Sequence, residues 1–463
     1  RYNQPLYVAV KTRQQVAAAG GEVTVDFYLI NEKNVRGKHQ LKISVTDSQG
    51  NITEVGTYET EAAGGEVYGQ LLVKDVKIPV PAAGGLCRIQ AKLCKENSVV
   101  TTGYDDILSV NLASNMLDGK GAVWEDGNAL QNFLKGKTKE AVAAYEDNLG
   151  KLDWIMVARP PKKDQLTMVP MEALRSADGK PGLDVVYYED MEFQKEVYHE
   201  VAKVVNLSAI EGATPSPFVY MLDGYGIKWS GKILPSVSGE YTIIPQSNDR
   251  SMIEVFVNGK KIYEITRKKE HLGDGKVYLE GGKSADIEIR FRHPRSNARC
   301  RLDWAVPNDK MPDAQRLMER AVNDGTKIFI IQSADEWSEF IAANSKAVFK
   351  DKFFVGTNWL GGVMFNKPHD IFKELPVGNA LNWPYQALIH TGVERMGLVM
   401  EGEELLVGAY HTYPMAIGTA MGIVPMGKGS VLFSTLDIYG NIINDSAAGL
   451  VAKKLIFNMI DFK

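Results

Sequence analysis

Hydrophobic and polar residues alternate through the N-terminal part of the chain. The segments 23–31 (VTVDFYLIN) and 41–47 (LKISVTD) carry apolar side chains at nearly every second position, which is the period of a half-buried strand. The tetrapeptide AAGG occurs three times, each time just before an extended run, and glycine permits the positive φ that tight turns need. Residues 1–105 are therefore predicted to form an antiparallel β-sandwich.

After this sandwich the pattern changes. The segment 153–158 (DWIMVA) is an almost unbroken apolar run, as expected of a strand that is covered on both faces. Two helices are predicted before it: one is capped by Asn128 and ends at Gly136, and the other is capped by Thr138 and ends at Gly150. This alternation of strands and helices is typical of a parallel sheet.

The alternation stops, and it resumes much later in the chain. A continuous apolar strand is predicted at 327–332 (KIFIIQ), and Ser333 with Glu336 has the pattern of a capping box for the next helix. A helix at 446–460 is predicted to close the chain. These elements belong with the earlier ones in a single open sheet with helices on its faces.

The simplest account is one doubly wound α/β domain, formed by 106–181 and 307–463 and interrupted by an insert at 182–306. The insert alternates cleanly at 251–259 (SMIEVFVNG) and 285–293 (ADIEIRFRH), so it is predicted to be a second β-sandwich. The predicted fold class is therefore multidomain α+β.

A family pattern runs through the insert. The run 227–260 contains a Trp–x–Gly strand, an SGEY turn, a polar SND loop and a hairpin that ends in Asn-Gly. Together with the segments 182–190 (GLDVVYYED) and 299–304 (RCRLDW), these features make the insert resemble the PA-fourteen domain, the lectin-like sandwich of anthrax protective antigen. The resemblance implies a β-sandwich with a carbohydrate partner.

The other two modules resemble parts of carbohydrate-degrading enzymes. Residues 4–13 and 23–50 are similar to the immunoglobulin-like sandwiches that follow the catalytic barrel in glycoside hydrolase family two. The α/β module resembles the inactive glutamine-amidotransferase-like, or flavodoxin-like, domains of β-galactosidase relatives, on its strand–helix order and on 427–438 (GKGSVLFSTLDI). These resemblances imply that the chain is the C-terminal accessory region of a β-galactosidase-like protein with an upstream catalytic barrel. They also imply a periplasmic or extracellular location, with a homo-oligomer as one option for its assembly.

Composition and charge narrow the function classes. The net charge of −4 over 463 residues provides no basic field for nucleic acid or for an acidic membrane surface. No apolar run reaches the roughly 20 residues that a membrane-spanning helix needs. Cys87 and Cys94 lie in one predicted strand, about 23 Å apart and beyond the reach of a disulfide; with Cys300 they are predicted to be buried small hydrophobes. A removed signal peptide or a longer parent protein would each account for a chain that begins at Arg1.

Catalytic chemistry is not indicated. The pair Asn31-Glu32 has the order of the acid/base motif of family-two hydrolases, but it ends a sandwich strand and no barrel is predicted, so it is interpreted as a turn. The α/β segments contain no cysteine and no GxSxG elbow, which excludes amidotransferase chemistry. His369, His390 and His411 could act as bases, but the sequence shows no obvious nucleophile for them to activate.

Two groups of residues are candidates for carbohydrate binding. The first is Trp124, Glu125 and Asp126, which follow a strand at the edge where open α/β sheets bind ligands. Trp124 would stack on a sugar ring, and the two acids would accept hydrogen bonds from hydroxyls. The alternative is that Trp124 packs in a domain interface while the acids lie in solvent. A dinucleotide is disfavoured because no GxGxxG follows any strand.

The second group lies in the insert. Sugar-binding PA-fourteen domains use two adjacent aspartates to hold a calcium ion, and the matching positions here are Asn248 and Asp249. One carboxylate is thus an amide, and Arg250 adds a positive charge, so weak or absent calcium binding is expected. Trp229 and Tyr225 are candidates for sugar contact without a metal.

The predicted function is a non-catalytic accessory region that positions or oligomerises a glycoside hydrolase and contacts polysaccharide or oligosaccharide. The alternative is a stand-alone carbohydrate-binding or adhesion protein with no attached enzyme. A hydrolase that uses the α/β crevice is the third hypothesis. The sequence before Arg1 would separate the first two.

Overall fold

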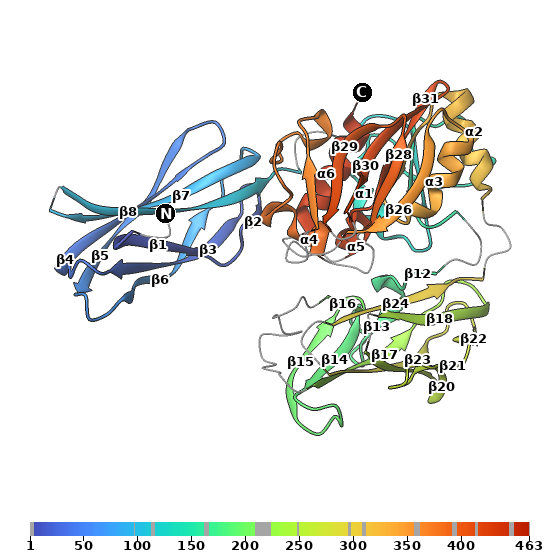
Figure 1. The fold of residues 1–463 in the computed structure, drawn as a ribbon, viewed down its shortest axis with the longest axis horizontal. Coiled ribbons are helices and arrows are strands. Elements are labelled where there is room, and N and C mark those ends of the chain that lie inside the picture. The colour runs from blue at the N-terminus through green and yellow to red at the C-terminus, as the bar shows by residue number, and fades with distance from the viewer. Residues whose placement is uncertain are drawn as a thin grey trace. The chain divides into compact units, whose positions relative to one another are not determined.

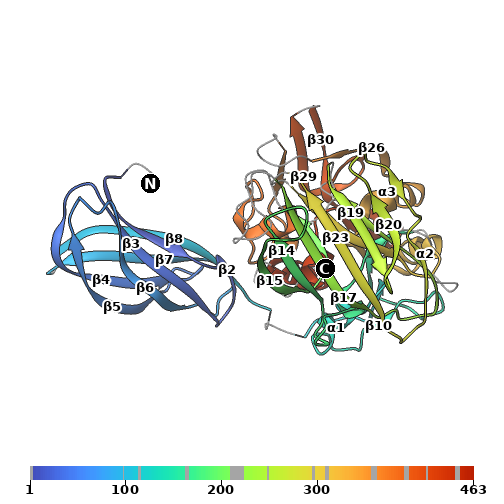
Figure 2. The same cartoon turned by 90° about the horizontal axis from the view of Figure 1, so that it is seen from below.

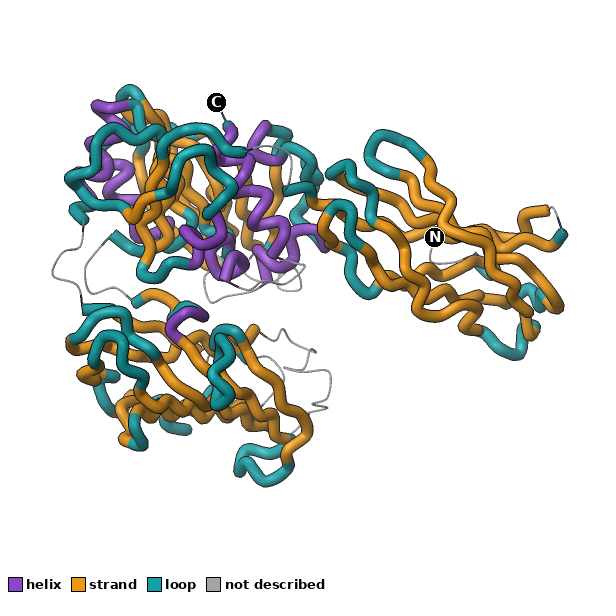
Figure 3. The backbone as a smooth tube through the Cα atoms, turned by 180° about the vertical axis from the view of Figure 1, so that it is seen from behind, coloured by secondary structure: helices purple, strands orange, loops and turns teal. Residues whose placement is uncertain are grey.

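A computed structural model of the chain shows a strand-rich protein with few helices (Figure 3). The chain separates into two compact units. The first consists of Arg1–Asn115, Lys367–Gln386 and Asp445–Lys463, and the second consists of Met116–Asn366 and Ala387–Asn444. The structure describes residues 4–96, 98–112, 116–161, 166–208, 224–247, 250–294, 298–307, 312–355, 362–390, 396–412, 415–443 and 449–462.

The first unit contains a β-sandwich (Figure 1, blue). One sheet has the strand order β1-β3-β6 and the other has the order β2-β8-β7-β4-β5. Val25, Phe27 and Leu29 of β3 alternate along the strand and are fully buried between the sheets, which is the predicted pattern. The strands are β1 (Leu6–Thr12), β2 (Val16–Ala18), β3 (Glu22–Asn31), β4 (Arg36–Thr46), β5 (Ile52–Ala63), β6 (Gly69–Pro79), β7 (Gly85–Lys95) and β8 (Ser98–Val110).

Two later segments cluster with this sandwich. The closing helix α6 (Leu450–Asp461) contacts β2, β8 and the 3-10 helix η3 (Asp370–Phe372), while η4 (Trp383–Tyr385) lies in the same unit. Lys454 of α6 donates to the carbonyl of Asn111 at 3.1 Å and to Glu374 at 2.6 Å. The predicted closing helix is therefore present, but its contacts link it to the sandwich, where the sequence assigned it to the α/β module.

The second unit is built around a ten-stranded mixed sheet. Five parallel strands have the order β10-β9-β11-β25-β31, and β30, β28 and β26 extend the sheet in antiparallel fashion. β29 also pairs with β30, and β27 pairs with β29. All of β11 is buried, which explains its continuous apolar run. The strands are β9 (Gly121–Glu125), β10 (Ala143–Ala144), β11 (Trp154–Ala158), β25 (Lys327–Ile330), β26 (Val348–Phe354), β27 (Val363–Asn366), β28 (Met396–Glu401), β29 (Glu404–Thr412), β30 (Met415–Met426) and β31 (Gly429–Ser434).

The helices of this sheet confirm some predicted boundaries and correct others. The helix predicted after Asn128 is present as α1, but the Asn128 side chain makes no cap hydrogen bond and the helix ends at Leu134; the predicted helix after residue 332 is α3. The helix predicted from Thr138 to Gly150 is wrong, because residues 143–144 pair with β9 as a strand and this long-range pairing overrides local propensity. The helices are α1 (Ala129–Leu134), α2 (Ala314–Asp324), α3 (Ala334–Ala343), α4 (Gln386–His390) and α5 (Ile438–Ile443).

The second unit also contains the predicted second sandwich. Its larger sheet has the order β15-β14-β17-β23-β19-β20-β21, with β13 on β17, and its strands lie side by side in Figure 2. The smaller sheet has the order β12-β24-β18-β22, with β16 on β24. The strands are β12 (Thr167–Met168), β13 (Leu174–Arg175), β14 (Leu183–Tyr188), β15 (Glu196–Ala202), β16 (Asn206–Ser208), β17 (Tyr225–Ile233), β18 (Gly239–Ser247), β19 (Met252–Val257), β20 (Lys260–Ile265), β21 (His271–Leu272), β22 (Lys276–Leu279), β23 (Ala285–His293) and β24 (Arg299–Ala305).

The sandwich begins earlier in the chain than the predicted insert. β12 pairs with β24 and β13 pairs with β17, although both strands precede residue 182. The reason is that Val169 and Leu174 are apolar and almost fully buried in the sandwich core, so they complete the sandwich. The three cysteines are free and buried, as predicted. None of the described helices is long and apolar enough to cross a membrane.

Candidate functional site

Trp124, the first candidate at the sheet edge, is an interior residue. It lies at the end of β9 with 3% of its surface exposed. Its ring centroid is 5.7 Å from that of Tyr145 and 5.6 Å from that of Trp337, and the Arg159 guanidinium lies 5.6 Å from the ring. A sugar ring needs an open aromatic face, so the structure does not support stacking on Trp124.

The two acids after Trp124 are committed to internal contacts. Glu125 accepts hydrogen bonds from the backbone amides of Leu130 and Gln131 at 3.0 Å and from the Tyr439 hydroxyl at 2.9 Å. These bonds hold the start of α1 against α5. Burial is the main cause that raises the pKa of Glu125, and the same effect raises the pKa of Tyr439.

Asp126 forms a buried cluster of its own. It accepts hydrogen bonds from Arg159 and from the Thr167 hydroxyl, both at 2.6 Å. The side chain of Arg159 is 5% exposed and that of Asp126 is 11% exposed. The prediction that these acids would face either sugar or solvent is therefore corrected: their oxygens serve the packing between β9, β11 and β12.

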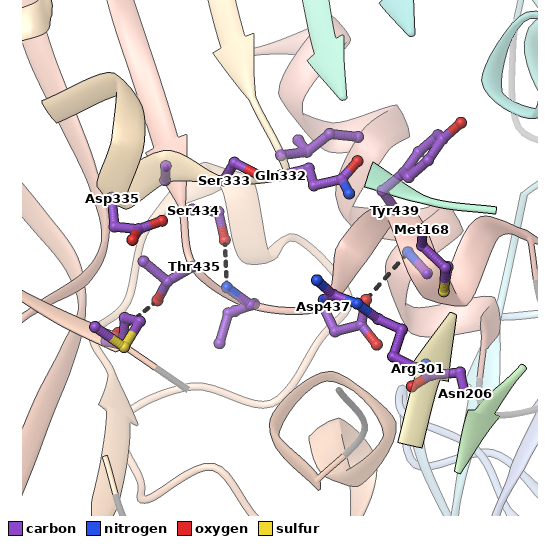
Figure 4. Close-up of a pocket in the computed structure, with 15 residues that line it drawn as sticks. Met168, Asn206, Arg301, Gln332, Ser333, Asp335, Ser434, Thr435, Asp437 and Tyr439 are labelled. Carbon is purple, nitrogen blue, oxygen red and sulfur yellow. Dashed lines mark hydrogen bonds between the residues drawn. The ribbon is translucent and has the colours of Figure 1, made fainter. Parts of the chain in front are cut away.

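A pocket opens a short way along the same sheet edge, and we call it the edge pocket (Figure 4). Its floor follows the carboxyl ends of the adjacent parallel strands β25 and β31, which is where open α/β sheets bind ligands. One wall comes from β12, β16 and β24 of the second sandwich. The pocket is small, with a cavity volume of about 40 Å³, and its lining is 331–335, 434–437, Met396, Tyr439 and Gly440 from the sheet, with Met168, Asn206 and Arg301 from the sandwich.

The turn from β25 into α3 has an unusual backbone. Ser333 has φ 52° and ψ 36°, in the left-handed region that non-glycine residues rarely adopt. Its side chain makes no cap hydrogen bond to α3, so the predicted capping box is not formed by Ser333. Strain of this kind concentrates at functional sites. Sequence reasoning found the turn but not the strain, because no motif marks it.

Two side-chain oxygens of the edge pocket are buried without a hydrogen-bond partner. They are Oε1 of Gln332 and Oδ1 of Asn206. Other polar groups in the pocket are occupied: Asp437 accepts from the amide of Gly440 at 3.1 Å, and Thr435 donates to the carbonyl of Met396 at 2.7 Å. A buried polar atom without a partner is costly, and ordered water commonly fills this role in a polar cavity.

The candidate sugar-contact aromatics of the second sandwich lie in its core. Tyr225 is fully buried and Trp229 is 3% exposed. Their ring centroids lie 6.3 and 6.2 Å from that of Phe291. Neither ring has a face for a sugar, which corrects that expectation.

The candidate calcium residues, Asn248 and Asp249, lie outside the described residues. Arg250, which follows them, has φ 78°. Ser251 and His293 form a buried contact of 3.1 Å beside the loop. The described residues contain no group of three or more His, Cys, Asp or Glu side chains that could hold a metal.

Asn31 and His369, which were also considered for catalysis, have structural partners. Asn31 is buried, and its amide exchanges hydrogen bonds with the backbone of Val35 at 2.8 and 2.9 Å, so Asn31-Glu32 begins a turn as predicted. Nδ1 of His369 accepts from the amide of Ile371 at the start of η3. Within the described part of the chain no hydrogen bond joins Ser333 to a histidine, and an activated serine needs such a base.

Comparison with known families decides the nature of the second sandwich, since residues 179–316 match the PA14 (PA-fourteen) domain family. Residues 179–316 form a PA14 domain. The anti-sigma-I factor RsgI3 of Acetivibrio thermocellus is 27% identical over 127 residues, which cover 27% of this chain and 19% of that protein. The chain thus spans about a fifth of the length of this relative.

Several solved structures are distantly similar. A β-glucosidase from Kluyveromyces marxianus is 11% identical, with 48% of this chain and 29% of that chain covered and a TM-score of 0.34. A PA14 sugar-binding domain from an RTX adhesin is 14% identical, with coverage of 27% and 88% and a TM-score of 0.23. A glycosyl hydrolase family 2 member from Bacteroides cellulosilyticus is 19% identical, with coverage of 34% and 24% and a TM-score of 0.18. These scores are too low to assign a fold or an activity to the chain.

Proposed function

We propose that this chain binds glycan through its PA14 domain and is a non-catalytic accessory region of a carbohydrate-degrading protein outside the cell or in the periplasm. The observation that carries the proposal is the PA14 match over 179–316. The polar SND loop of that domain, at 247–249, holds the residues that match the sugar-binding positions of the family. Asp249 is the group that we assign to the ligand, with Asn248 beside it.

A glycan array tests this proposal directly. The full chain should bind one class of oligosaccharide on the array, and Asp249→Ala should remove that binding signal. Asp178→Ala is the matched control, because Asp178 is an exposed aspartate in a loop of the same unit. Retention of no glycan, or equal loss in both variants, would contradict the proposal.

The attachment to an enzyme is the second part of the proposal. An upstream family-two barrel would make this chain an accessory region, whereas an adhesin-like partner sequence would favour the stand-alone alternative. The genomic sequence before Arg1 distinguishes the two. We expect the purified chain to hydrolyse no aryl glycoside, and turnover that is lost in Glu32→Gln would contradict a non-catalytic role.

We further propose the domain organisation: an immunoglobulin-like sandwich at 1–105, a discontinuous flavodoxin-like or amidotransferase-like domain, and the PA14 domain inserted into it. The support for the α/β assignment is the order of its parallel strands, which reads 2-1-3-4-5 in sequence order, the flavodoxin order. Because β12 and β13 pair with the insert, excision of 167–306 should leave a sharper calorimetric transition for the α/β domain than excision of 182–306. The opposite ranking would contradict the proposed insertion.

A further inference from the structure

We propose that the first β-sandwich carries a second carbohydrate site, in a hollow at the seam where its two sheets meet, and that this site binds a chain of neutral sugars through tyrosine side chains. We call it the seam hollow, and its lining includes Tyr7 and Ala9 of β1 with Thr102, Gly103 and Tyr104 of β8. The proposal goes beyond the proposed function, because the PA14 domain contributes none of these residues.

The seam joins strands from different sheets. β1 is the end strand of one sheet, and it contacts β8 of the other, which pairs with the short β2 only at 108–110 (Figure 1). The Thr101 hydroxyl of β8 donates to the carbonyl of Leu6 at 2.9 Å. A Cβ atom at Gly103 would collide with the carbonyl of Val8, so glycine is required for this approach. These contacts fix the distance between β1 and β8, and with it the width of the hollow.

Strand alternation places two tyrosines on the outer side of the seam. Val8 is 1% exposed in the sandwich core, so the side chain of its neighbour Tyr7 lies on the outer face of β1. Ile107 is buried in the same core, which puts Tyr104, three positions earlier, on the outer face of β8. Both tyrosines line the seam hollow, one from each strand.

A third tyrosine extends this surface onto the next strand. Tyr28 of β3 lies between the buried Phe27 and Leu29, so its side chain is on the outer face. In the ladder it is opposite Ala9, one outward position along β1 from Tyr7. Tyr7 and Tyr28 are therefore diagonal neighbours, about 7–8 Å apart, and the short side chain of Ala9 does not cover the ring of Tyr28. Together with the tyrosine of β8 they form a row that crosses β8, β1 and β3.

The rings of this row are available to a ligand. Among the described residues, the side chains of Tyr7 and Tyr28 are half-buried, have no hydrogen-bond partner and contact no other aromatic ring or cation. Tyr104 is held in place, because the Arg88 guanidinium lies 4.0 Å from its ring centroid. A tyrosine ring offers an apolar face to the C–H groups of a sugar ring, and its hydroxyl exchanges hydrogen bonds with sugar hydroxyls.

The size and the charge of the hollow fit neutral sugars. Its cavity volume is about 470 Å³, which falls in the usual range of small-molecule sites, roughly 300–1,000 Å³. In the described lining the charged residue is Asp105, which accepts a hydrogen bond from the Thr12 hydroxyl. No cation of the described lining would pair with a phosphate or a carboxylate. The exposed Thr102 adds a hydroxyl that donates and accepts hydrogen bonds.

Calorimetry on the full chain tests the proposal, with soluble β-glucan, xylan and galactomannan as neutral probes and polygalacturonate as the anionic probe. The measurements are made on the natural chain and in the Asp249→Ala background, which removes the ligand group assigned to the PA14 loop. We expect at least one neutral polysaccharide to bind in both. Tyr7→Ala should raise its Kd by about tenfold, because a stacked ring is lost, and Tyr28→Ala should raise it by a smaller factor.

Two further variants separate a sugar contact from a packing effect. Tyr7→Phe keeps the ring, so it should retain most of the affinity that Tyr7→Ala loses. Tyr68→Ala is the matched control, because Tyr68 is a 60% exposed tyrosine that precedes β6, at the other edge of the same sheet. It should leave Kd unchanged. Thermal melts of all variants should coincide with that of the natural chain, and equal losses of affinity in Tyr7→Ala and Tyr68→Ala would overturn the proposal.

The remaining outcomes are also decisive. If no neutral polysaccharide binds in the Asp249→Ala background while the natural chain binds one, the PA14 loop accounts for the binding, so the proposed function stands and this proposal fails. If the tyrosine variants remove binding and Asp249→Ala changes nothing, the assignment to the PA14 loop fails and this proposal stands. Binding of polygalacturonate alone would show that the ligand class is wrong. Self-association that Tyr7→Ala abolishes, without any sugar binding, would show a protein interface and overturn the proposal.

Discussion

Two turns at the carboxyl edge of the same sheet differ in how their polar groups are used. After β9, Glu125 and Asp126 each have partners within the protein, namely backbone amides, Tyr439, Arg159 and Thr167. After β25, Gln332 has a buried oxygen with no partner and Ser333 has a left-handed backbone. The comparison teaches that acidic residues at a sheet edge do not by themselves make a ligand site. Acids whose oxygens already accept hydrogen bonds from the protein are not free to bind a ligand.

The largest effect is expected from Asp126→Ala. This change removes the carboxylate that faces the buried Arg159 guanidinium at 2.6 Å, and the loss of one member of a buried ion pair lowers stability by about 3–5 kcal/mol. Urea unfolding of the full chain measures it. The double variant Asp126→Leu with Arg159→Met should recover most of the lost stability. A loss below about 1 kcal/mol in Asp126→Ala would show that the buried ion pair does not stabilise the turn after β9.

A smaller effect is expected at Ser333. Ser333 already carries the strain of the left-handed region, roughly 1–2 kcal/mol for a residue with a Cβ, and a β-branched side chain fits this region less well, so Ser333→Val should lower the free energy of unfolding further. Ser333→Gly should leave it unchanged or raise it, because glycine adopts this conformation freely. Urea unfolding of both variants checks the prediction. Equal stability of the two variants would mean that the turn after β25 is not strained.

The pH dependence of stability should reveal the buried Glu125. Its pKa is raised in the folded protein, chiefly by burial, so its stabilising contribution is complete below the unfolded pKa and is lost as the pH rises through the folded pKa. In Glu125→Gln the decline of stability above about pH 4 should be shallower. Unfolding free energies measured across this range test it, and parallel curves for the two proteins would contradict it.

The smallest effect is expected from calcium. A third polar loop, at 247–251, carries Asp249 with Asn248 as its neighbour, and one carboxylate with Arg250 nearby makes a poor calcium site. Thermal melts of the natural chain with calcium and with chelator should coincide. Asn248→Asp should restore a rise, which would correspond to about 2.7 kcal/mol at a hundredfold excess over Kd. A clear rise in the natural chain that Asp249→Ala removes would contradict this expectation.

Local pattern was sufficient for many of the elements. The alternation in β3 and the continuous apolar runs of β11 and β25 predicted strands that the structure contains. The family features of 227–260 predicted the PA14 domain, which the family match confirms. The helix predicted from Thr138 was wrong because the pairing of 143–144 with β9 is not visible in the local pattern.

The amino-acid sequence by itself determined the strand-rich architecture, the PA14 domain and the polar residues at the sheet edge, because periodicity and turn chemistry are local properties. The tertiary structure alone decided which of those residues are free for a ligand. Asp126 finds Arg159 and Thr167 only after β9, β11 and β12 have come together, and Gln332 and Asn206 line one pocket although they are far apart in the sequence. Whether a buried polar atom has a partner depends on contacts between distant segments, which no local pattern encodes.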